Sequence, residues 1–189
     1  SSIYTILHIS NDPYVEWLKT TLNAGAQVGY DPRMQRANWE KSTKKCLEEG
    51  EITLIPIDEN PIDLFWKERP VSNEDVALLL DEKYTGKHSL EKRKELGLQI
   101  SKNNCASAFI TQLDSIAWLL NIRGNDVPCN PVLLCHGILH SDGGFDLFIN
   151  ENKIPEDFQN HVGQDVSVYS SNNMIKRLEI LSGKKVQFD

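Results

Sequence analysis

The chain alternates between short apolar runs with strand-like composition and longer segments whose apolar residues recur at helical spacing. This succession is typical of an α/β fold. Residues 3–9 are rich in β-forming side chains and predict a strand, and Pro13 suits the first turn of a helix that ends at Gly25. The pattern then predicts a strand at 26–30, a helix at 39–49 and a strand at 52–57.

An irregular stretch at residues 60–70, which contains two prolines, precedes a second series of elements that begins at Val71. Residues 141–144, with the sequence Ser-Asp-Gly-Gly, supply the positive-φ positions of a tight hairpin. We therefore predict two α/β domains, residues 1–70 and residues 71–189. In the second domain the pattern predicts helices at 89–102, 114–121 and 155–161 and after Ser171, and strands at 105–110, 132–139, 145–149, 166–169 and 186–188.

Composition narrows the class of protein without giving a function. The 189 residues carry 20 Lys and Arg against 27 Asp and Glu, a net charge of −7, which argues against a nucleic-acid partner. No apolar run reaches the ~18–20 residues of a membrane helix, and no basic-then-apolar leader opens the sequence. We therefore expect a cytoplasmic protein without a membrane partner, in which the thiols are free and Cys105 and Cys135 lie in the core.

Most signatures of catalysis are absent, including the phosphate-binding loop and the nucleophile elbow. His136 and His140 have the spacing of a helical zinc motif, but their surroundings predict a strand, on which they would lie ~13 Å apart. We therefore expect no metal site here. A cysteine enzyme using Cys129 or Cys135 stays open as an alternative, although neither thiol has an evident base.

A basic run lies in and before the predicted helix at 89–102. We interpret it as a solvated face that nearby acidic residues balance, with Leu90, Leu96 and Ile100 turned inward. The run consists of Lys83, Lys87, Lys92, Arg93 and Lys94.

The most unusual stretch is an apolar helix that leads into a polar, proline-stiffened loop at residues 113–131. In a rigid loop, Arg123 is suited to bind a carboxylate and Asp126 an amine. The alternative is that Asp126 and Asn130 satisfy the loop backbone while Arg123 lies on the surface.

The same stretch, L-D-S-I-A-W-L-L-N-I-R-G-N-D-V-P-C-N-P-V from Leu113, resembles the signature of the second N-terminal domain of three-domain Xaa-Pro aminopeptidases (aminopeptidase P). The resemblance extends over nearly the whole chain, in order. Further similar segments are G-A-Q-V-G-Y-D-P from Gly25, N-P-I-D-L-F-W-K-E-R-P from Asn60, and Y-T-G-K from Tyr84.

The resemblance implies a mixed β-sheet flanked by helices, with the ribonuclease H-like motif of creatinase N-terminal domains. Family members remove the N-terminal residue from peptides with proline second. They use two metal ions, usually manganese, in a C-terminal pita-bread domain whose ligands are two Asp, one His and two Glu. The N-terminal domains shape the substrate entrance and, in many members, the homodimer. The implied cleft-facing loop contains Asn121 and Arg123, with Arg123 contacting substrate and Asp126 and Asn130 shaping the loop.

None of the metal-ligand motifs of that family occurs in the sequence. We therefore expect no catalytic residue, metal or cofactor in this chain. We interpret residues 1–70 as the later half of the first creatinase-like domain and residues 71–189 as the second. A start without Met and an end inside a predicted strand suggest a piece of a longer protein. Its partners would be its own catalytic domain and proline-containing peptides. The alternative is a stand-alone creatinase-like interaction module without peptidase activity.

Overall fold

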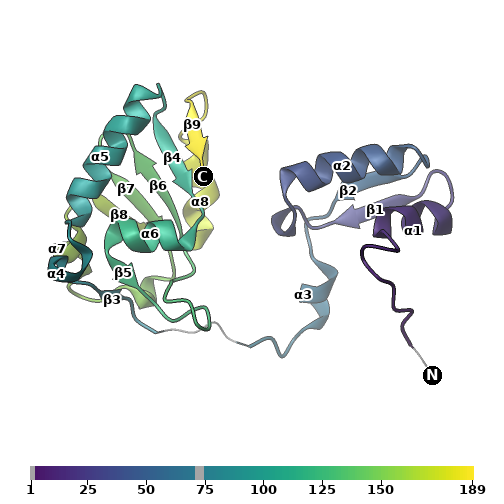
Figure 1. Ribbon diagram of the computed structural model, residues 1–189, viewed down its shortest axis with the longest axis horizontal. Helices are drawn as coiled ribbons and strands as arrows, with labels where there is room; N and C mark the ends of the chain where they lie inside the picture. The colour runs from purple at the N-terminus through teal and green to yellow at the C-terminus, as the bar shows by residue number, and fades with distance from the viewer. Residues whose placement is uncertain (1–2, 71–74) are drawn as a thin grey trace. The chain divides into compact units, whose positions relative to one another are not determined.

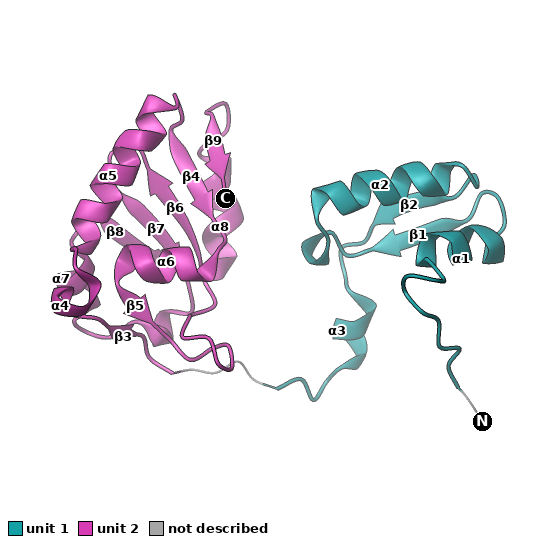
Figure 2. Ribbon diagram, viewed as in Figure 1, with its two compact units in different colours: residues 1–70 teal, residues 71–189 magenta. Residues whose placement is uncertain are grey.

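The chain forms two compact units, residues 1–70 and residues 71–189 (Figure 2). They are seen in a computed structural model that describes residues 3–70 and 75–189. The beginning of the second series at Val71 lies outside the described residues.

Unit 1 is a small parallel two-stranded sheet with helices packed on it (Figure 1). Its core is formed by Leu47, Ile52 and Leu54, which are almost completely buried, because α2 and β2 turn their apolar sides toward α1. Strand β1 pairs only with β2 among the described residues. The elements are α1 (Tyr14–Thr21), β1 (Gln27–Tyr30), η1 (Pro32–Met34), α2 (Ala37–Glu48), β2 (Thr53–Pro56) and α3 (Pro61–Phe65).

The strand predicted at residues 3–9 is wrong. The segment has turns and irregular backbone, and Ile3, Ile6 and Ile9 are more than four-fifths exposed. A strand is stabilised by a neighbour that accepts and donates its backbone hydrogen bonds, and no described strand pairs with this segment. The stretch at 60–70, predicted to be irregular, contains the short helix α3, which begins where Asn60 Oδ1 accepts from the backbone N–H of Ile62 at 2.9 Å.

Unit 2 is built on a mixed five-stranded sheet in the order β8-β7-β6-β4-β9, which confirms the predicted fold class. Strand β6 is antiparallel to both β4 and β7, whereas β9 and β8 at the two edges run parallel to their neighbours. A second, two-stranded antiparallel ladder joins β3 to β5. The strands are β3 (Leu78–Leu79), β4 (Ser107–Ile110), β5 (Ile122–Arg123), β6 (His136–His140), β7 (Phe145–Phe148), β8 (Val166–Tyr169) and β9 (Val186–Phe188).

Apolar clusters lie on both faces of this sheet, because successive strand residues point to opposite sides. Leu139 belongs to the larger cluster, which α5, α6 and α7 cover, and Ile138 to the smaller one, which α8 covers (Figure 1). Cys105 and Cys135 are buried in the larger cluster, as predicted. The helices are α4 (Glu82–Thr85), α5 (Ser89–Lys102), α6 (Leu113–Leu120), α7 (Phe158–Val162) and α8 (Met174–Glu179), with η2 (Glu151–Lys153) and η3 (Ser171–Asn173).

Helix α5 lies directly on the predicted hairpin between β6 and β7. Gly143 in the hairpin has φ +91°, and a Cβ on Gly97 of α5 would lie 2.9 Å from the Gly143 nitrogen. This close approach explains why the helix has a glycine in its middle. Strand β6 begins later than the predicted 132–139, because Val132 and Leu134 bond to the preceding loop through Asp126 instead of entering the ladder.

The interpretation of the basic run as a solvated face is wrong for two of its members. Lys92 is 2% exposed and Arg93 is fully buried, whereas Lys94 is exposed. Arg93 donates from Nη1 to the Gly143 carbonyl at 2.5 Å and from Nη2 to the Val162 carbonyl at 2.6 Å. A buried guanidinium is tolerated where acceptors satisfy its N–H groups. The inward face of α5 can therefore be polar at Arg93, where the two carbonyl groups face it.

Candidate functional site

The motif loop at residues 121–134 begins with a left-handed residue at the end of α6. Helix α6 is anchored by its buried apolar side and ends at Asn121, which has φ 56° and ψ 41°. The Asn121 N–H bonds back to the Ala117 and Trp118 carbonyls, and Asn is among the few non-glycine residues that adopt this conformation readily. The chain then turns directly into β5, so the conformation of Asn121 sets the place of Arg123.

The side chain of Asn121 is buried and satisfied by residues outside the motif. Its Oδ1 accepts from Lys92 Nζ at 2.6 Å, and its Nδ2 donates to the Lys87 carbonyl at 2.9 Å. Its backbone carbonyl accepts from the Leu80 N–H at 2.9 Å. Asn121 therefore holds the loop in shape and does not present its amide to a ligand.

Arg123 is half-buried and lines a hollow of about 540 Å³. Its Nη1 donates to the Ala117 carbonyl at 3.1 Å and to the Ile122 carbonyl at 2.8 Å. Within residues 3–70 and 75–189, its Nε and Nη2 make no hydrogen bond, so a planar pair of donors remains. The rest of the lining is an apolar wall from Val76, Leu78 and Pro131, and the pair of Asp75 and Asn125, in which Asn125 Nδ2 donates to Asp75 Oδ2 at 3.3 Å. The donors of Arg123 beside the apolar wall suit a ligand that combines a carboxylate with an apolar body.

Asp126 is turned into the protein. Its Oδ1 forms an ion pair with Lys153 Nζ at 2.5 Å, and the two side chains are 1% and 3% exposed. Its Oδ2 accepts from the Leu134 N–H at 2.7 Å. A carboxylate enclosed in this way has no open side for a substrate amine, so Asp126 fixes the loop.

Asn130 closes the tip of the loop through its backbone. Its N–H donates to the Val127 carbonyl at 3.0 Å, and its own carbonyl accepts from the Val132 N–H at 2.8 Å. Cys129, next to it, is exposed and has φ 62°. The side chain of Asn130 is exposed.

Sequence reasoning missed two buried lysines that bind the motif loop before and after Arg123. Lys92 holds Asn121 before the arginine, and Lys153 holds Asp126 after it. For Lys92 a signal exists, because it lies on the same face of α5 as the inward residues Ser89 and Leu96, three and four residues away. For Lys153, which is 27 residues from its partner, the sequence has no local signal.

The sheet also brings together a serine, a histidine and an aspartate that form no recognisable motif in the sequence. His140 Nδ1 lies 2.9 Å from Ser107 Oγ, and His140 Nε2 lies 3.3 Å from Asp146 Oδ2. Ser107 is fully buried, so its hydroxyl cannot meet a substrate. Burial raises the pKa of Asp146, but hydrogen bonds from His140 and Arg177 outweigh it and hold that pKa below its usual value. The cluster fastens α8 to the sheet.

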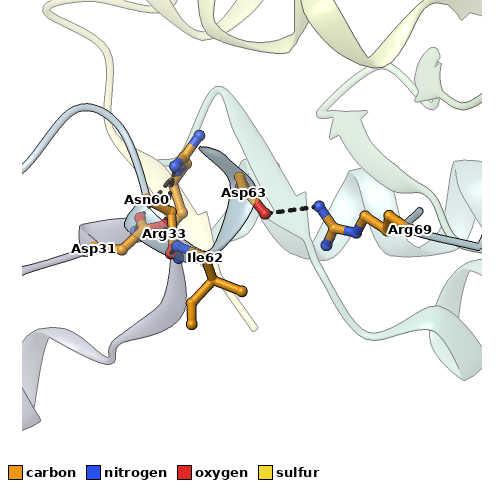
Figure 3. Close-up of polar contacts among 6 residues, drawn as sticks. All are labelled: Asp31, Arg33, Asn60, Ile62, Asp63 and Arg69. Atoms are coloured by element: carbon orange, nitrogen blue, oxygen red, sulfur yellow. Dashed lines mark hydrogen bonds and ion pairs between the residues drawn. The ribbon is translucent and has the colours of Figure 1, made fainter. Parts of the chain in front are cut away.

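The polar contacts of unit 1 are likewise internal (Figure 3). Asp31 accepts from Arg33 through both carboxylate oxygens, at 3.0 Å and 2.9 Å, and from Asn60 Nδ2 at 3.0 Å. The Arg33 guanidinium, helped by Asn60, holds the pKa of the Asp31 carboxyl well below its usual range. Asp63 and Arg69 form a further ion pair at 2.9 Å. The bond between Asn60 and Asp31 joins the turn after β1 to the segment after β2.

Within the part of the chain that the structure describes, no three histidine, cysteine, aspartate or glutamate side chains gather as ligands. His136, for example, stacks on Phe109 with ring centroids 6.1 Å apart. No helix in the described ranges combines the length and hydropathy of a membrane span.

The thiols give a direct test of the cysteine-enzyme alternative. Burial raises the pKa of Cys135 to about 12, so its thiolate is scarce at neutral pH, whereas Cys129 is exposed. We expect iodoacetamide at pH 7.5 to modify Cys129 in the native chain, and Cys105 and Cys135 only in denaturant. Peptide mass spectrometry measures the sites. Rapid native alkylation of Cys135 would contradict this assignment.

The comparisons with known proteins identify the class to which this fold belongs. The sequence model of the creatinase/prolidase N-terminal domain matches residues 68–189, and the chain belongs to this family. It is 32% identical over 167 residues to a protein named probable Xaa-Pro aminopeptidase P from Ajellomyces capsulatus (strain H143). It is also 32% identical, over 181 residues, to the protein of the same name from Neosartorya fischeri. These matches cover 88% and 95% of the chain but 26% and 28% of the relatives.

A solved structure to which this chain is similar belongs to the same class of enzyme as these relatives. The crystal structure of X-prolyl aminopeptidase from Caenorhabditis elegans, described as a cytosolic enzyme with a di-nuclear active site, matches with a TM-score of 0.79 and 26% identity. The match covers 95% of this chain and 28% of that one. The predicted resemblance is thereby confirmed, and the chain spans about a quarter of the length of the relatives it matches.

Proposed function

We propose that this chain is the non-catalytic N-terminal part of a metal-dependent Xaa-Pro aminopeptidase. Residues 1–70 are the later half of its first creatinase-like domain, and residues 71–189 are the second. The observation that carries the proposal is the match along 95% of this chain to about a quarter of an X-prolyl aminopeptidase. The parent would work in the cytoplasm with two manganese ions in its catalytic domain.

In this proposal, unit 2 shapes the substrate entrance. The free donors of Arg123 and the apolar wall beside it form one side of a path for proline-containing peptides. The chain's partners are its own catalytic domain and a second copy in a homodimer. The buried contacts of Asn121 and Asp126 support this role, because they hold the motif loop in place without using Arg123 Nε and Nη2.

Two measurements test the proposed function. The purified chain, given Mn²⁺ and the peptide Arg-Pro-Pro, is expected to release no arginine, and release above a no-protein control would overturn the non-catalytic assignment. The coding frame beyond residue 189 is expected to continue into a region with the set of two Asp, one His and two Glu. A stop codon directly after Asp189 would overturn the proposal in favour of a stand-alone interaction module.

A further inference from the structure

The carboxyl end of α6 gathers basic side chains. The Ala117 carbonyl accepts from Arg123, the Trp118 carbonyl from Lys92 Nζ at 2.8 Å, and the Leu120 carbonyl lies 3.2 Å from His161 Nε2. The last carbonyls of a helix lack partners within the helix and carry partial negative charge. This end of α6 therefore attracts basic groups from separate parts of unit 2.

Lys92 is unusual among these groups, because it is buried and pairs with no carboxylate among the described residues. Its ammonium is held by the Trp118 carbonyl and by Asn121 Oδ1, and it lies 4.4 Å from the centre of the Trp118 ring. These partners are neutral dipoles and a π face, which stabilise a cation without neutralising its charge. Among the described residues, no opposite charge therefore cancels that of Lys92, which acts on the other charged groups near it.

Those surroundings are positive as well. Burial lowers the pKa of Lys92, and the charges of Arg123 and Lys87 lower it further. Lys87 is paired with Glu95 at 2.6 Å, whereas Lys92 and Arg123 form no ion pair among the described residues, although Asp75 lines the same hollow as Arg123. Arg123 lines the hollow, and its Nε and Nη2 make no hydrogen bond within the described part of the chain. An anion at Arg123 would relieve the repulsion between these cations.

We propose that Lys92 is a positioning residue for Arg123, and that together they make the hollow a site for the carboxylate of a short peptide whose apolar part lies against Val76, Leu78 and Pro131. Lys92 acts through Asn121, because its bond to Oδ1 holds the left-handed turn from which Arg123 follows after one residue. Arg123 makes the direct contact. This inference rests on the proposed function in assigning Arg123 to the substrate side.

The test uses the isotope-labelled 189-residue chain and two probes, the dipeptide Ala-Pro and its C-terminal amide, which lacks the carboxylate. Backbone amide shifts of Ile122, Arg123 and Gly124 are followed during titration. Ala-Pro is expected to shift them and to bind at least about tenfold more tightly than the amide, the effect of one charge-assisted hydrogen bond. Equal binding of the two probes, or no shift with Ala-Pro, would overturn the carboxylate site.

Variants separate positioning from general stability. Lys92→Met is expected to weaken Ala-Pro binding about tenfold and amide binding much less, while the exposed control Lys94→Met changes neither. The amide shifts of β7 report whether Lys92→Met disturbs folding. If it does, Asn121→Gly is the second test, because it removes Oδ1 but keeps the left-handed turn. Asn121→Gly should then show the same loss of Ala-Pro binding. Arg123→Gln is expected to abolish the difference between the probes.

The outcomes distinguish this inference from the proposed function. Unchanged binding in both Lys92→Met and Asn121→Gly would overturn the role of Lys92 and leave the proposed function in place. Release of arginine by the chain, or a stop codon after Asp189, would overturn the proposed function without touching the measured carboxylate preference.

Discussion

Arg93→Ala is expected to lower the free energy of unfolding of unit 2 by about 3–5 kcal/mol, the cost of a buried cavity together with unpaired carbonyl groups. Arg93 is fully buried on α5 and donates to the hairpin at Gly143 and to the end of α7 at Val162. Removing it leaves both carbonyls without the donor that Arg93 supplies. Burial lowers the pKa of Arg93, so its desolvation already costs stability that these two bonds offset.

Three variants make this expectation sharp. Lys94→Ala, on the next position of the same helix, is expected to change stability by less than about 0.5 kcal/mol, because its side chain is exposed. Arg93→Met keeps most of the side-chain volume but has no donor. The stability that this variant loses therefore measures the effect of the hydrogen bonds. Urea unfolding followed at the β7 amides by NMR measures unit 2 separately from unit 1. A loss below 1 kcal/mol for Arg93→Ala would contradict the role given to it.

The same residue shows what sequence patterns can and cannot predict. Helical spacing correctly predicted α5 and the inward position of Ile100. Arg93 lies three residues before Leu96 and seven before Ile100, on the same side of the helix, but its charge led to the prediction of an exposed position. Only the carbonyls of distant Gly143 and Val162 reverse that preference. The predicted strand at residues 3–9 failed for the related reason that strand propensity has no effect without a pairing neighbour.

The candidate site was predicted in part. The motif identified Arg123 and the loop around it, because an apolar helix that ends in Asn-x-Arg-Gly is a local pattern. The buried state of Asp126 could not be predicted, since its partner Lys153 lies two strands later along the chain. The sequence reports which residues a loop contains, whereas the fold decides which of them keep open donors for a ligand.

Asp126→Asn is expected to destabilise unit 2 by about 3–5 kcal/mol, because it leaves the ammonium of Lys153 buried without its counter-charge. The amide retains an oxygen for the Leu134 N–H, so the loss reports the charge rather than the loop bond. Lys153→Met should cost a comparable amount. The exposed pair of Lys83 and Asp81 supplies the control, since Lys83→Met should have no measurable effect on unfolding.

The double variant Asp126→Asn with Lys153→Met decides how the pair acts. If the two groups stabilise each other, the double variant loses much less than the sum of the single losses, because no charge remains buried alone. Urea unfolding of the four proteins gives this coupling energy. Additive losses would mean that each side chain acts through separate packing. A coupled pair would hold the motif loop after Arg123, as the bond from Lys92 to Asn121 holds it before Arg123.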